Sequence, residues 1–122
     1  MHEVTIETQF SSAHNIRGYD GACEKLHGHN WRVQVSVRAK RLDKIGMVVD
    51  FKELKACTRK LVDGLDHKYL NECPPFDKKN ATAENIAEFL FKRLSRAVND
   101  GRLKVSRVKV WESDTSSSEY CE

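Results

Sequence analysis

Residues 31–38 alternate strictly between apolar and polar side chains, and this pattern constrains the fold more than any other feature of the chain. The apolar members are Trp31, Val33, Val35 and Val37. Residues two apart on a strand point to the same side of a sheet, so the pattern predicts a strand with one buried and one solvated face. The same alternation over residues 4–10 predicts an earlier strand.

Helical periodicity replaces this alternation in the middle of the chain. Asp50 followed by Glu53 is a variant of the capping box, which favours a first helix over residues 50–63. Thr82 is the expected N-cap of a second helix, which the segment 99–101 ends. The residues expected to be buried are Phe51, Leu54, Leu61, Val62 and Leu65 on the first helix, and Ile86, Phe89, Leu90, Leu94, Ala97 and Val98 on the second.

Two further strands are predicted after the helices, one over residues 105–111 and a short one that includes Tyr120. The strands at each end can pair locally while the helices group between them. This order predicts an α+β fold, in which two helices pack on one face of a four-stranded antiparallel sheet. With 122 residues, the chain is expected to form a single domain that spans residues 1–122.

Composition narrows the classes of function. A hydrophobic fraction of 39% and a charged fraction of 32% are typical of a soluble protein, and no segment approaches the ~20 apolar residues of a membrane helix. The net charge of +3 is mild and the basic residues are scattered, so nucleic acid is not an expected partner. The first residues do not resemble a secretion signal, so the four cysteines are expected to be free thiols in a cytoplasmic protein. A secreted, disulfide-bonded protein is the alternative.

Three histidines, His14, His27 and His29, lie close together in the sequence. Imidazole is a common zinc ligand, and a catalytic zinc typically has three protein ligands. His27 and His29 continue the apolar series of residues 31–37, so both face one side of the strand. If the chain stays extended as far as His14, that residue continues the series of Phe10 and Ser12. The pattern therefore predicts a zinc site, against the alternative of unrelated, hydrogen-bonded histidines.

Cys23 lies four positions before His27, and the residues alone leave open three possible roles for its thiol. A thiol near a cation is readily ionised, which suits a base or a nucleophile. The same thiol can be a fourth ligand in a closed structural site. It can also be a small buried apolar residue.

Two other positions carry groups suited to chemistry. Asp66 and His67 are adjacent and can form a proton-transfer pair, against the alternative of a capping aspartate beside an exposed histidine. Glu112 ends an apolar strand, where its carboxylate can accept the paired N–H groups of a guanidine-like heterocycle edge. The alternative for Glu112 is an ordinary solvated side chain.

Together these residues resemble the 6-pyruvoyl-tetrahydropterin synthase superfamily, and most of all its 6-carboxy-5,6,7,8-tetrahydropterin synthase branch, which serves queuosine and other deazapurine pathways. The resemblance runs from about residue 4 to the end and rests on six motifs in the family's order. These motifs occupy residues 11–14, 23–30, 49–55, 65–71, 82–85 and 111–113.

The resemblance implies a tunnelling fold, in which trimers close their sheets into a barrel and two trimers stack into a homohexamer with active sites between subunits. The polar strand face of Arg32, Gln34, Ser36 and Arg38 would then line a wet tunnel. The resemblance also implies roles for single residues. These are His14, His27 and His29 as zinc ligands, Cys23 as catalytic base, Asp66 and His67 as an acid–base relay, and Glu112 as the anchor of the pterin 2-amino and N3 positions.

The implied reaction converts 7,8-dihydroneopterin triphosphate into 6-carboxytetrahydropterin, acetaldehyde and triphosphate, with zinc as the only cofactor. The short spacing from Cys23 to His27 favours the carboxy-forming branch over the pyruvoyl-forming synthases. A dihydroneopterin aldolase-like activity is a further alternative. From another class, a non-catalytic zinc-binding assembly module would use Cys23 to close the metal site. Arg17 and Lys25 are only candidates for contact with the triphosphate.

Overall fold

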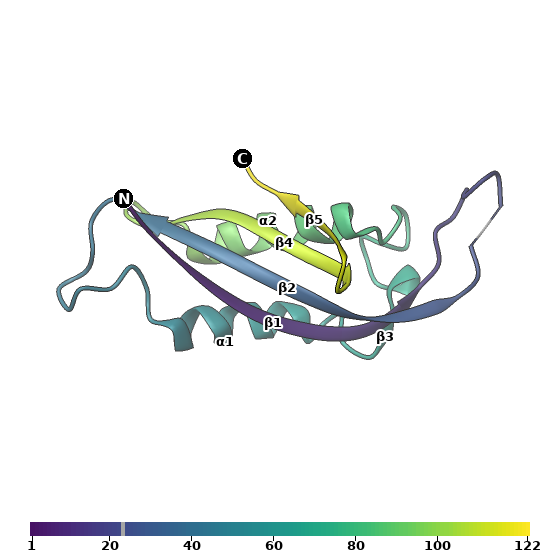
Figure 1. The fold of residues 1–122 in the computed structure, drawn as a ribbon, viewed down its shortest axis with the longest axis horizontal. Coiled ribbons are helices and arrows are strands. Elements are labelled where there is room, and N and C mark those ends of the chain that lie inside the picture. The colour runs from purple at the N-terminus through teal and green to yellow at the C-terminus, as the bar shows by residue number, and fades with distance from the viewer. Residues whose placement is uncertain (23) are drawn as a thin grey trace.

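Five strands form one sheet in the computed structural model, which describes residues 1–22 and 24–122 (Figure 1). Their order across the sheet is β3-β1-β2-β4-β5. The strands are β1 (His2–His14), β2 (His27–Ala39), β3 (Lys68–Tyr69), β4 (Lys104–Ser113) and β5 (Ser116–Tyr120). The predicted α+β class is confirmed, and the four expected strands are antiparallel neighbours.

The prediction of a four-stranded, purely antiparallel sheet was wrong in one respect. The fifth strand, β3, pairs in parallel with β1, through Ser12 with Lys68 and Ala13 with Tyr69. A strand of two residues is too short to show any alternation, so the sequence pattern could not reveal it. It leads into a short 3₁₀ turn, Leu70–Glu72.

Helices α1 (Phe51–Val62) and α2 (Ala83–Val98) lie on the same face of the sheet (Figure 1). Thr82 caps α2 as predicted, because its hydroxyl accepts a hydrogen bond of 3.1 Å from the Asn85 N–H. Asp50 caps α1 by accepting a hydrogen bond of 2.8 Å from the Lys52 N–H. Ile86, Leu90 and Leu94 are buried as expected, whereas Phe51 is 54% exposed and Ala97 is exposed. Phe51 is the first residue of α1.

The core lies between the helices and the facing side of the sheet. Its centre is the predicted β2 series of Trp31, Val33, Val35 and Val37, all with 0% exposure. Fully burying a side chain of this kind contributes about 1.5–3 kcal/mol. The opposite face of the sheet is polar, and there the Arg32 guanidinium lies 3.9 Å from the centre of the Trp111 ring.

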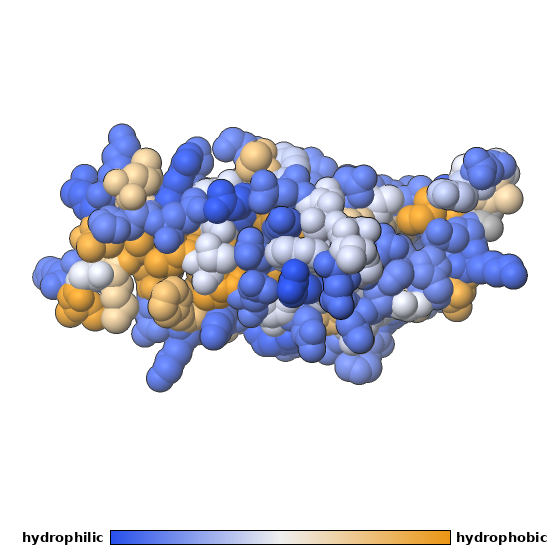
Figure 2. Space-filling model, in the orientation of Figure 1, coloured by the Kyte–Doolittle hydropathy of each residue, from blue (hydrophilic) through white to orange (hydrophobic). Residues whose placement is uncertain are grey.

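The surface is uneven in polarity (Figure 2). Hydrophilic residues dominate most of the face shown, and apolar residues gather toward the end of the molecule that holds the N-terminus. Leu42, Ile45 and Met47 are exposed apolar residues in the connection between β2 and α1. Within the described residues, no helix has the length and apolar character needed to cross a membrane.

The register of β1 against β2 determines where the histidines lie. His14 is directly opposite His27, and Ser12 is directly opposite His29. Directly opposite residues in an antiparallel pair share one face of the sheet, so all three imidazoles project from the same face as Trp31. The predicted extension of the chain as far as His14 is confirmed.

Candidate metal centre

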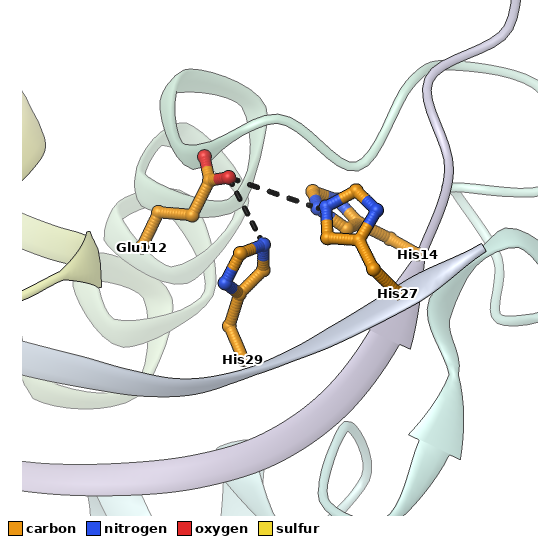
Figure 3. A group of neighbouring side chains, drawn as sticks. All are labelled: His14, His27, His29 and Glu112. Atoms are coloured by element: carbon orange, nitrogen blue, oxygen red, sulfur yellow. Dashed lines mark hydrogen bonds and ion pairs between the residues drawn. The ribbon is translucent and has the colours of Figure 1, made fainter. Parts of the chain in front are cut away.

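Three imidazoles and one carboxylate converge at the end of the β1–β2 hairpin (Figure 3). His14 comes from β1, His27 and His29 from β2, and Glu112 from β4. Their ligand-type atoms all lie within 4.8 Å of one another. The Nε2 atoms of His14 and His27 are 3.1 Å apart, and Glu112 Oε1 lies 3.0 Å from His29 Nε2.

The outward nitrogens of two of these rings are held by backbone carbonyls. His14 Nδ1 lies 2.7 Å from the Ala81 carbonyl oxygen, and His27 Nδ1 lies 2.8 Å from the Lys25 carbonyl oxygen. A carbonyl can only accept, so each Nδ1 carries the proton and donates it. In the neutral ring this leaves Nε2 with its lone pair directed into the cluster, which is the usual arrangement around metal-binding histidines.

His29 Nε2 is a buried atom with no hydrogen-bond partner among the described residues. Its contact with Glu112 Oε1 is within ion-pair distance but lacks the alignment of a hydrogen bond. A buried polar atom without a partner costs about 1–3 kcal/mol. Burial is the main cause that lowers the pKa of His29, against the opposing effect of Glu112.

These donors fit a zinc ion. Tetrahedral zinc with bonds of about 2.0–2.1 Å to nitrogen or oxygen holds its ligand atoms roughly 3.3 Å apart. The separations of 3.1 Å between His14 and His27 and 3.0 Å between His29 and Glu112 are close to that value. Three neutral imidazoles with one oxygen donor are also a set that zinc accepts well.

Two asparagines that sequence reasoning did not single out support the segment after His14. The Asn80 side chain accepts a hydrogen bond of 3.0 Å from the Arg17 N–H and donates one of 3.0 Å to the Arg17 carbonyl. Asn71 pairs with the backbone of Asn15 in the same way, at 3.2 and 2.8 Å. Asn80 also directly precedes Ala81, whose carbonyl orients His14. Asn71 falls within the motif of residues 65–71, and this was the only sign in the sequence that either asparagine has a role at the site.

Asp66 and His67 are in contact, with Asp66 Oδ1 3.1 Å from His67 Nδ1, and their role in proton transfer stays a prediction. Asp66 Oδ1 also accepts a hydrogen bond of 2.8 Å from the Ser11 N–H, and this bond is the main reason that the pKa of Asp66 is lowered. The His67 side chain is 82% exposed and does not join the described cluster of histidines. Its backbone has φ of 55°, in the left-handed region, where the peptide N–H donates to the Ser11 carbonyl at 2.6 Å.

Cys23 lies outside the described residues, so its predicted role stays a prediction. The next residue, Glu24, makes contacts with both Ile16 and His27. The Glu24 N–H donates to the Ile16 carbonyl at 2.9 Å, and Glu24 Oε1 lies 3.8 Å from His27 Nδ1. Glu24 therefore lies close to His27 of the histidine cluster.

Comparison with known proteins links this geometry to one family. The family model described as 6-pyruvoyl tetrahydropterin synthase matches residues 3–122. A 6-carboxy-5,6,7,8-tetrahydropterin synthase of Haemophilus influenzae is 35% identical over 144 residues, covering 100% of both chains. One of Synechocystis is 38% identical over 125 residues, covering 98% of this chain and 93% of the relative. The solved 6-pyruvoyl tetrahydropterin synthase of Caenorhabditis elegans has a TM-score of 0.79 at 25% identity, covering 100% and 97% of the two chains.

Proposed function

The chain belongs to the 6-pyruvoyl tetrahydropterin synthase family, and on this premise we propose that it is a zinc-dependent 6-carboxy-5,6,7,8-tetrahydropterin synthase. The reaction converts 7,8-dihydroneopterin triphosphate and water into 6-carboxytetrahydropterin, acetaldehyde and triphosphate, in queuosine biosynthesis and in the cytoplasm. Two relatives with this name, at 35% and 38% identity, support the carboxy-forming branch. The observation that carries the proposal is the inward convergence of three Nε2 atoms, one of which is buried and has no hydrogen-bond partner in the part of the chain that the structure describes.

His14, His27 and His29 would hold the zinc ion. The ion would supply Lewis-acid polarisation of the hydroxyl groups on the substrate side chain. The Ala81 and Lys25 carbonyls keep two of the rings in the ligand tautomer, so the site needs little rearrangement before it binds metal.

Glu112 would anchor the pterin ring by accepting hydrogen bonds from the 2-amino group and N3. Charge-assisted bonds of this kind hold a heterocycle firmly in position. The amino edge and the side-chain carbon lie at opposite ends of the fused ring. The Glu112 oxygen now 3.0 Å from His29 Nε2 therefore turns away from the imidazoles when it receives that edge.

Cys23 would act as the thiolate base that removes a proton from the substrate side chain. Asp66 would hold the Nδ1 proton of His67, which leaves Nε2 of that ring free to accept or return a proton. The 82% exposure of His67 suits a site that is completed by a second copy of the chain. A hexamer built from two trimers is the assembly that we propose.

Metal and product analysis tests the function directly. Purified protein loaded with zinc is incubated with 7,8-dihydroneopterin triphosphate, and bound metal and products are measured. We expect one zinc per chain and the release of acetaldehyde. His14→Ala should lose both metal and turnover, whereas the matched variant His2→Ala, changed at an exposed histidine outside the cluster, should keep both. Zinc-loaded protein that leaves the substrate unchanged would refute the proposal.

Two alternatives give different results in the same experiment. A 6-pyruvoyl-tetrahydropterin synthase, the name carried by the Caenorhabditis elegans structure, would retain the side-chain carbons and release no acetaldehyde. A non-catalytic zinc-binding module would bind zinc without turnover. In that case, X-ray absorption spectroscopy would find the sulfur of Cys23 among the zinc ligands.

A further inference from the structure

A second cleft, of about 380 Å³, opens at the opposite end of the molecule from the histidines. It lies where β2 ends at Ala39, beside the N-terminus and far from β3 (Figure 1). The length of β2 separates it from His27 by roughly 40 Å. Five basic side chains from two segments line it, namely Arg38, Lys40, Arg41, Arg102 and Lys104. We propose that this cleft binds a small molecule that carries consecutive phosphate groups.

None of the basic side chains of the cleft forms an ion pair within 4.0 Å in the described residues, although the carboxylates of Asp43 and Asp100 lie near enough to interact with the charge of Arg102. The arginines and lysines that form ion pairs within 4.0 Å in the described residues are Arg32, Arg59, Lys92 and Arg107, none of which lines the cleft. Asp100 is the one carboxylate in its lining. Its Oδ1 accepts hydrogen bonds of 2.6 Å from the N–H groups of Arg102 and Leu103, so it serves the turn before β4.

Two of the cations are direct neighbours in the sheet. Arg38 on β2 is paired with Lys104 on β4, and like charges in directly opposite positions destabilise a sheet. Arg38 is also paired with Glu3 on β1. However, the Glu3 carboxylate accepts hydrogen bonds of 2.6 Å from both Arg107 and Ser106. Both Glu3 oxygens are therefore engaged by other groups, and an external anion beside Arg38 and Lys104 would offset their mutual repulsion.

The Arg102 side chain is held in a fixed position on one side of the cleft by hydrogen bonds. Its guanidinium donates to the Arg41 carbonyl at 3.0 Å and to the Val48 carbonyl at 2.8 Å. These bonds tie the segment after β2 to the start of β4. Arg38, Lys40, Arg41 and Lys104 remain to meet the ligand, and both residue types bind phosphate, arginine through paired N–H groups and lysine as a point charge.

The size of the cleft restricts the ligand. Ligand pockets range from about 300 to 1,000 Å³, so 380 Å³ suits a compact group. Two or three linked phosphates fit this volume, and their several negative charges suit the four cations that remain. Free triphosphate and the terminal phosphates of a nucleoside triphosphate share that chemistry. Free triphosphate is also a product of the proposed reaction, but its binding here is measured without turnover, so failure of this site and failure of the proposed function are distinguishable.

Isothermal titration calorimetry of the full-length protein with sodium triphosphate, orthophosphate and ATP tests the proposal. We expect triphosphate to bind more tightly than orthophosphate and its affinity to fall as salt is raised. The double variant Arg38→Gln/Lys104→Gln should bind triphosphate at least ten-fold more weakly. The matched variant Lys52→Gln/Lys55→Gln removes the same charge from the exposed surface of α1 and should keep the wild-type affinity.

Each result has one meaning. If ATP displaces triphosphate, the ligand is the phosphate tail of a nucleotide, and if ATP fails to do so, the ligand is free triphosphate; both support the site. Equal loss of affinity in the two double variants would overturn it, because the binding would then follow net charge alone. A short oligonucleotide that binds more tightly than triphosphate and loses affinity in Arg38→Gln/Lys104→Gln would also overturn it, in favour of a nucleic-acid surface.

Discussion

Glu112 Oε1 lies 3.0 Å from His29 Nε2, so a carboxylate oxygen of β4 occupies the space that the imidazoles of β1 and β2 surround. This one contact permits two roles for Glu112. It can be an additional metal ligand, or it can be a substrate anchor that rests against the metal ligands until the pterin arrives. The two roles differ in whether the histidine cluster still binds zinc when the carboxylate is removed.

As a substrate anchor, Glu112 is dispensable for metal binding. We expect Glu112→Gln to keep its zinc and to bind substrate more weakly by about 1.5–3 kcal/mol, the usual contribution of a hydrogen bond to a charged group. Zinc content and the substrate dissociation constant are measured side by side. Asp114→Asn, an exposed change of the same charge on the neighbouring turn, serves as the control. Loss of zinc from Glu112→Gln would make Glu112 a ligand instead.

Removal of zinc should destabilise the folded protein, because the ion binds only when the histidines are brought together. At a free zinc concentration of 100 times the dissociation constant, this stabilisation is about 2.7 kcal/mol. We predict that a chelator lowers the melting temperature of the wild type and of His2→Ala, and leaves that of His14→Ala unchanged. A chelator effect in His14→Ala equal to that of the wild type would argue that the ion binds elsewhere.

Asp66 should make stability depend on pH in the acid range. The Ser11 N–H, His67 and Arg59 hold the pKa of Asp66 below its usual value in the folded state. A carboxyl with a lowered pKa stabilises the protein above its unfolded pKa of about 3.9, and this contribution is lost as the pH falls through the folded value. Urea titrations at pH 7 and pH 3 should therefore find the wild type more stable than Asp66→Asn at pH 7, with a smaller difference at pH 3. A difference that is the same at both pH values would contradict this.

Asn80 should affect metal binding although it touches no metal ligand. Without its side chain, the segment that presents the Ala81 carbonyl to His14 loses both hydrogen bonds to the Arg17 backbone and keeps those that the Arg17 guanidinium donates to the Phe76 and Lys79 carbonyls. Changes behind metal ligands typically weaken affinity 10–100-fold, and we expect about ten-fold for Asn80→Ala in a zinc competition assay. Asn80→Asp keeps the acceptor for the Arg17 N–H and loses the donor to its carbonyl, so its affinity should be intermediate. Wild-type affinity in Asn80→Ala would mean that the carbonyl is positioned by other contacts.

The strand pattern predicted the centre of this site because its period matches the geometry of the sheet. His27 and His29 share the parity of Trp31, and the pairing of His14 with His27 follows once β1 and β2 form a hairpin in this register. The supporting residues have no such period. Asn71 and Asn80 lie in a non-repetitive connection, and their partners are 56 and 63 residues away in the sequence. Long-range contacts of this kind come from tertiary packing, which local patterns do not encode.

The basic cleft is a second feature that local sequence patterns do not reveal. The lysines and arginines are scattered along the sequence, which argued against a nucleic-acid partner and gave no sign of a basic cluster. The register that pairs Arg38 with Lys104 brings together charges that are 66 positions apart in the numbering. Phe51 is a smaller case, because helical spacing assigned it to the buried face and its place at the end of α1 left it 54% exposed.

The pairing of His14 with His27 is the last rung of the β1–β2 ladder. Strand ends of this kind open most readily, and their amide protons exchange with solvent first. An ion shared by the two rings would clamp the ladder where it otherwise frays. Slow amide exchange around these positions would thus report an occupied site without any assay of catalysis. The loop that follows His14 would then begin at a residue whose position is fixed.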